Sequence, residues 1–76
     1  MNGKRRSELR DALLMLSRAA TIVESACDRE QDALVNYPEN LQSTEKYETM
    51  ESAAENLTEA VDKINEAKEC IEAAVK

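Results

Sequence analysis

Few residues in this chain are able to do chemistry, and their spacing points to binding and not to catalysis. The 76 residues contain no histidine, no Ser–His–Asp arrangement and no glycine-rich phosphate loop. Glu48, Glu51 and Glu55 follow helical spacing and could in principle hold a hard cation, but such carboxylates usually form a solvated helix face. The sequence therefore predicts a protein that is not an enzyme and that uses no metal or other cofactor.

The two cysteines, Cys27 and Cys70, are predicted to be free thiols, which fits a cytoplasmic protein. Cys27 falls in an apolar helical row and is expected to be buried, whereas Cys70 is expected on an outer surface. Asp11 and Arg18 interrupt the first apolar run, and no span approaches the roughly 20 residues that a membrane helix needs. We therefore expect a cytoplasmic location and no membrane partner.

The charges are unevenly distributed along the chain. The net charge of −6 disfavours general phosphate binding, and nucleic acid is an unlikely partner because no aromatic residue accompanies the N-terminal cations. A possible anion patch consists of Lys4, Arg5, Arg6, Arg10 and Lys68. Multiplied by symmetry, these cations could hold a nucleotide ligand, although a frayed and solubilising N-terminus explains the same cluster.

The elements that carry these residues are two segments with a heptad pattern. Apolar residues recur at a and d positions in alternating steps of four and three. The positions are Leu9, Leu13, Leu16, Ala20, Val23, Cys27, Glu30 and Leu34, followed by Tyr47, Met50, Ala54, Leu57, Val61, Ile64, Lys68, Ile71 and Val75. Two long helices with a short connector predict an all-α, antiparallel two-helix hairpin.

The expected boundaries follow from the connector. Pro38 ends the first helix near residue 35, and Ser43 is the predicted N-cap of the second, with Glu45 in its first turn. We expect a basic, flexible N-terminus over residues 1–6 and one hairpin domain over 7–76, with helices over about 7–35 and 44–75 and a connector over 36–43. Leu41 is expected to fold over the end of the seam.

Alanine recurs at the g positions beside both predicted seams. The set is Ala12, Ala19, Ala26 and Ala33, then Ala53, Ala60, Ala67 and Ala74. Small side chains would let another helix approach closely, although the helix propensity of alanine also explains the pattern. Leu14, Met15, Ile22 and Val35 add more apolar surface than one facing helix can cover. These features predict a homo-oligomer, at least a dimer that forms a four-helix bundle.

Polar and aromatic residues near the seam have more than one interpretation. Glu30 and Lys68 break the two apolar rows, and such residues fix register and oligomeric state, fray into water or contact a ligand. Glu30 is expected near Tyr47 and Lys46. Tyr37 and Tyr47 are possible partner anchors, although covering the end of the core is the more common role of such residues.

The stretch PENLQSTEKYETMESAAENLTEAVDKINEAKECIEAA carries a resemblance. Its P-E-N-L-Q connector, Ser-led acidic helix start and repeated N-L-x-E-A and I-x-E-A units resemble short helical proteins of Gram-positive gut bacteria and their phages and prophages. The resemblance covers roughly residues 30–75. It implies a mobile-element context in a host bacterial cytosol and supplies no activity or site residues.

Taken together, the sequence predicts a non-enzymatic helical binding protein. The specific form that we expect is a phage or prophage inhibitor that engages a host defence protein through helix-face packing. This expectation is an analogy with other phage proteins of this size, which often inhibit host defence proteins. An oligomeric sponge that sequesters an anionic nucleotide signal between subunits is the first alternative, and a structural or assembly adaptor is the second. The acidic surface of the second helix favours a basic protein target, whereas the N-terminal cations favour an anionic small ligand.

Overall fold

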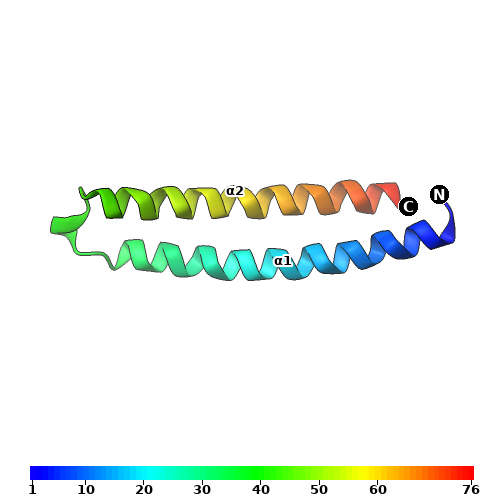
Figure 1. The fold of residues 1–76 in the computed structure, drawn as a ribbon, viewed down its shortest axis with the longest axis horizontal. Coiled ribbons are helices and arrows are strands. Elements are labelled where there is room, and N and C mark those ends of the chain that lie inside the picture. Colours follow the sequence, from blue (N-terminus) through cyan, green and yellow to red (C-terminus); the bar gives the residue numbers. More distant parts are fainter.

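The computed structural model describes residues 1–76 as two antiparallel helices joined by a short connector (Figure 1). Helix α1 spans Gly3–Val35, a 3₁₀ turn spans Glu39–Leu41 and helix α2 spans Glu45–Ala74, with no strand. The Cα atoms fill a rod of 59 × 14 × 14 Å. Both termini lie at one end, the open end, opposite the turn end (Figure 1). The predicted all-α helical hairpin is confirmed.

Helix α1 begins earlier than the predicted start near residue 7. Asn2 is its N-cap, and the Asn2 Oδ1 atom accepts a hydrogen bond of 2.8 Å from the backbone N–H of Arg5. An asparagine cap satisfies one of the N–H groups that a helix start leaves unpaired, so the helix can begin at Gly3. Residues 3–6 therefore form the first turn of α1. The C-terminal end at Val35 lies where the sequence predicts it.

The N-cap of α2 is Thr44, and the prediction of Ser43 is wrong by one residue. Thr44 Oγ1 accepts a hydrogen bond of 3.3 Å from the backbone N–H of Tyr47 and donates one of 2.7 Å to the Leu41 carbonyl. The same side chain thus caps the helix and closes the 3₁₀ turn, which Ser43 is not placed to do. Glu45 lies in the first turn, as predicted, near the positive end of the helix dipole.

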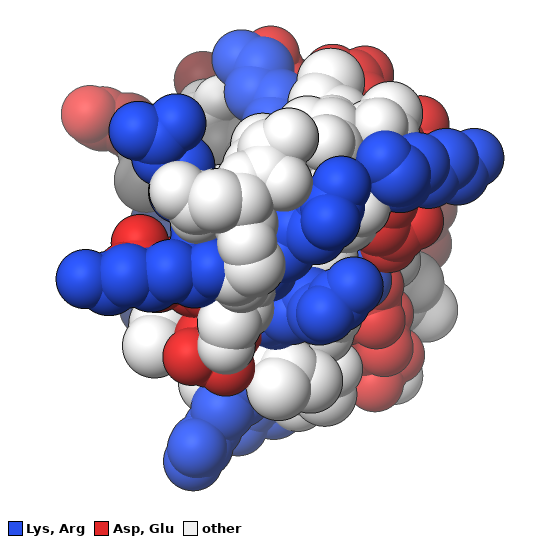
Figure 2. Space-filling view, turned by 90° about the vertical axis from the view of Figure 1, so that its right-hand side faces the viewer, with Lys and Arg blue, Asp and Glu red and all other residues white.

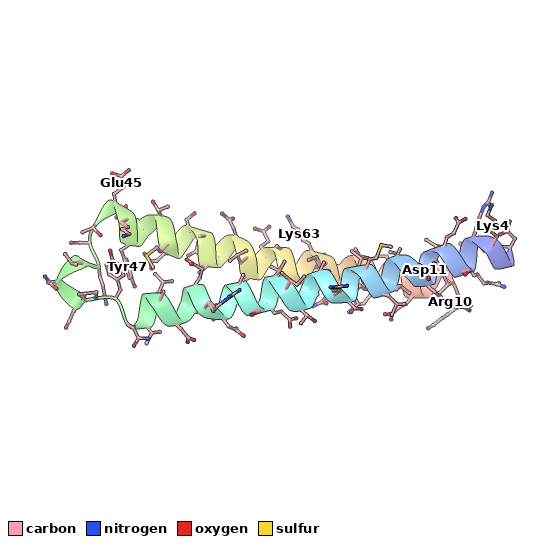
Figure 3. All side chains as sticks on the ribbon, turned by 60° about the horizontal axis from the view of Figure 1, so that its bottom comes forward. Lys4, Arg10, Asp11, Glu45, Tyr47 and Lys63 are labelled. Atoms are coloured by element: carbon pink, nitrogen blue, oxygen red, sulfur yellow. The ribbon has the colours of Figure 1, made fainter.

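The end of the seam is closed by two tyrosines. Leu41, which the sequence places over the end of the seam, is partly covered and remains 40% exposed. The rings of Tyr37 and Tyr47 pack against each other, with centroids 5.4 Å apart and a tilt of 58° between their planes. Figure 3 shows Tyr47 at the turn end. Both rings are half-buried, so the commoner of the two expected tyrosine roles is the one that the fold uses.

The seam between α1 and α2 follows the predicted heptads. Every predicted a and d residue is buried or half-buried, and none is exposed. Only Ala20, Cys27 and Ala54 are fully buried, and all three occupy a positions where small side chains let the helices approach. The large apolar residues of the seam remain half-buried, because one neighbouring helix covers only one side of each. The hairpin therefore has a seam but no enclosed core.

Candidate functional site

The two alanine stripes lie on the same side of the hairpin. In an antiparallel pair the g positions of one helix flank the g positions of the other. An open groove confirms that residues of both stripes meet, and its lining is Ala26, Arg29, Glu30, Ala53, Asn56 and Leu57. The alanine face is defined here as Ala12, Ala19, Ala26, Ala53, Ala60 and Ala67, with Met15 and Ile22 at its edge. Five of its six alanines are half-buried, and Ala67 is exposed.

The apolar residues outside the seam separate into two groups. Met15 is 71% exposed and Ile22 is 60% exposed. Each follows an alanine of the stripe by three residues, so both lie next to the alanine face. Leu14 is equally exposed, but the helical step of about 100° places it on the other side of α1. Val35 is exposed at the turn end. The alanine face is therefore extended by Met15 and Ile22 and not by Leu14.

The opposite side of the hairpin is polar, and it is called the polar face below. A second groove there is lined by Glu24, Cys27, Asp28, Gln31, Thr58, Val61 and Asp62. Cys27 Sγ lies 3.3 Å from Thr58 Oγ1 and 3.8 Å from the Ala54 carbonyl. Thr58 also donates to the Ala54 carbonyl at 3.0 Å, so the only buried polar contacts of the seam lie on this side.

The two cysteines are placed as predicted. Cys27 is 7% exposed and packs in the seam, whereas Cys70 is exposed on α2. Both are free thiols.

Glu30 and Lys68 are both half-buried, and neither forms an ion pair, since Glu59–Lys63 is the only salt bridge in the structure. Glu30 lines the groove on the alanine face with Arg29, Ala53 and Leu57. Lys68 lies in the open-end half of α2. The groove of the alanine face thus contains one unpaired carboxylate.

The predicted anion patch forms the open end of the molecule. Lys4, Arg5 and Arg10 are exposed and Arg6 is half-buried, and none has a carboxylate within 4.0 Å. Figure 2 shows Lys and Arg side chains around this end. They do not converge, because Lys4 and Arg10 project to different sides of α1 (Figure 3), and no groove includes them. The structure brings these cations to one end without forming a pocket.

Arg6 is a seam residue that the sequence analysis missed. Its Nε atom is buried and has no hydrogen-bond partner. Arg6 precedes Leu9 by three residues, so it continues the heptad at an a position where its aliphatic stem can cover the last apolar residues. The spacing of three residues before Leu9 indicates this seam position in the sequence. The position is easily overlooked, because an arginine next to Lys4 and Arg5 is readily interpreted as part of a flexible terminus.

The remaining charged surface contains few specific contacts. Lys63 Nζ lies 3.0 Å from Glu59 Oε1, and this hydrogen bond, with the charge of Glu59, raises the pKa of Lys63 above its ordinary value. No group of three or more Cys, Asp or Glu side chains is arranged to hold a metal ion. Neither helix contains a stretch that is apolar and long enough to cross a membrane.

Comparison of the chain with protein-family models, with curated proteins and with solved structures gives no match. Function is therefore inferred from the alanine face, the polar face and the distribution of charge.

Proposed function

We propose that this chain is a non-enzymatic binding protein that works by packing its alanine face against other helices. The observation that supports this most strongly is the contrast between a seam with three fully buried residues and a neighbouring face of small apolar side chains that are half-buried or exposed. Small residues let a second layer of helices approach closely, and Met15 and Ile22 supply large apolar contacts at its edge. Such a face has little use in a hairpin that acts alone.

The specific form of the proposal is an inhibitor, encoded by a phage or prophage, that engages a bacterial host protein. Two features support it. The connector and second helix resemble short helical proteins from that source, and the outer surface of α2 is acidic, with Glu48, Glu55, Asp62 and Glu69 spaced at seven-residue intervals. An acidic surface suits a basic target and speeds its association. In this form the alanine face assembles the protein and the acidic surface meets the target.

Site-specific photo-crosslinking in bacterial cells tests whether the alanine face contacts other helices. An aliphatic diazirine residue is placed at Ile22 in one variant and at the exposed Gln31, which lines the groove of the polar face, in a control variant. We expect a crosslinked product from position 22 whose joined peptide, sequenced by mass spectrometry, comes from a helix. Absence of any crosslink at position 22, with the protein folded by circular dichroism, would contradict the proposal.

A nucleotide sponge is a second candidate, and the unpaired cations Lys4, Arg5, Arg6 and Arg10 at one end support it. Four cations without carboxylate partners are available to an anion, particularly if assembly multiplies them. Calorimetric titration with a cyclic dinucleotide tests this candidate. Saturable binding that is lost in Arg5→Glu would support the sponge, whereas no heat beyond that of dilution would exclude this ligand class.

A further inference from the structure

The charges of the hairpin are segregated along its length. The open-end half, residues 1–20 and 60–76, contains eight Lys or Arg and six Asp or Glu, a side-chain charge of +2. The turn-end half, residues 21–59, contains two Lys or Arg and ten Asp or Glu, a charge of −8. The two halves together give the net charge of −6. The molecule is therefore an elongated rod with strongly different charge at its two ends.

Two arrangements would cover the alanine face with a second copy related by a two-fold axis. An axis along the rod places the two turns at the same end, and each α1 then faces the α2 of the other copy. An axis across the rod places the turns at opposite ends, and each helix then faces its own equivalent. All facing helices run antiparallel in both cases, so packing alone does not choose between them.

We propose that the alanine face is covered by a second copy of this chain in the reversed orientation, with the two turns at opposite ends of a four-helix bundle. This arrangement places each half of charge −8 beside a half of charge +2. The alternative places the two −8 halves side by side, and like charges within a Debye length of about 8–10 Å repel each other. The inference rests on the proposed role of the alanine face and identifies its partner.

The exposed area also fits a second copy. The chain exposes 5708 Å². A compact monomer of this mass, 8.5 kDa, would expose about 4,700 Å², so the hairpin has about 1,000 Å² in excess. A standard interface buries about 800 Å² on each partner. One additional copy would thus cover most of this excess area.

Spin-label distances test the orientation. One label is placed at the turn end through Ser43→Cys and, in a separate control protein, near the middle of the rod through Lys63→Cys. Both proteins carry Cys27→Ala and Cys70→Ser, and circular dichroism confirms that they remain helical. In the reversed dimer the two labels at position 43 are separated by about 45 Å or more, the length of a helix of 30 residues. The two labels at position 63 lie within about 25 Å, since packed helices are 8–10 Å apart.

Each result decides a different part of the proposal. Long distances at position 43 with short distances at position 63 support the reversed dimer. Short distances at both positions would show turns at the same end and overturn the orientation while leaving the alanine face as a contact surface. A monomeric mass with no coupling at position 63 would overturn the second copy as partner. A crosslink from position 22 to a different protein would then still support the proposed function.

Discussion

The alanine face and the polar face flank the same seam, yet they differ in what they leave unsatisfied. On the polar face Thr58 caps the Ala54 carbonyl and contacts Cys27, and the groove there is lined mainly by charged or polar side chains, with Val61 as an apolar member. The exposed Leu14 also lies away from the alanine face. On the alanine face small apolar side chains form the stripe, and Arg29, Glu30 and Asn56 are the polar residues that line its groove. The polar face therefore exposes mainly groups that water can solvate, whereas the alanine face exposes small apolar side chains, which we propose that other helices cover. Function is therefore expected on the alanine face.

The largest effect is expected from a charge in the seam, because the seam supports both faces. Leu57→Asp places a carboxylate against the opposite helix without a cation, at a cost of several kcal/mol. A chain of 76 residues has little stability to lose, so we expect loss of the helical circular dichroism signal. Asn56→Asp, which adds the same charge at an exposed neighbour, is the control and should remain folded. Full helicity in Leu57→Asp would contradict the heptad assignment.

A charge at the edge of the alanine face is expected to affect association without unfolding the hairpin. Ile22→Glu puts a carboxylate beside Ala19 and Ala26, where a covering helix would have to desolvate it. We expect at least tenfold weaker association, about 1.4 kcal/mol, by sedimentation velocity. Thr21→Glu adds the same charge on the adjacent exposed position, away from the face, and should associate nearly as the unmodified protein does. Equal association of both variants would remove the distinction between the faces.

A smaller effect is expected on the polar face. Thr58→Val keeps the volume and removes the hydroxyl that contacts Cys27 Sγ and the Ala54 carbonyl. Since the Ala54 carbonyl also belongs to the hydrogen-bonded ladder of α2, the expected loss of unfolding free energy is about 1 kcal/mol or less. Association should not change. A large shift in sedimentation for Thr58→Val would show that the polar face also contacts a partner.

The smallest effect is expected from the exposed ion pair. Glu59→Gln removes the carboxylate that raises the pKa of Lys63, but both side chains are in water. We expect the same thermal unfolding midpoint and the same sedimentation coefficient as for the unmodified chain. A clear drop in either would show that this pair lies at a contact.

Much of the fold could be predicted from the sequence because the heptad rhythm specifies both the helices and their mutual faces. The seam was predicted completely between Leu9 and Val75, and Cys27 was placed correctly. The connector was harder, since Ser43 and Thr44 are equally good caps and only the geometry of the 3₁₀ turn selects Thr44.

The candidate site was predictable in composition but not in arrangement. The sequence identifies the alanine stripes and the exposed residues Leu14, Met15 and Ile22 as one group. The structure divides that group, because only Met15 and Ile22 border the alanine face. The basic cluster was likewise found in the sequence, but its side chains spread around the open end instead of converging. In both cases the direction in which each side chain points from its helix determines which residues come together.

The most direct test of the central claim is the mass of the unmodified protein by sedimentation equilibrium over a range of concentrations. If the alanine face packs against a second copy, the mass will be twice the 8.5 kDa of the chain, and it will fall toward 8.5 kDa in Ile22→Glu. A mass of one chain at all concentrations, with the helices intact, would contradict the claim that a second copy covers the face.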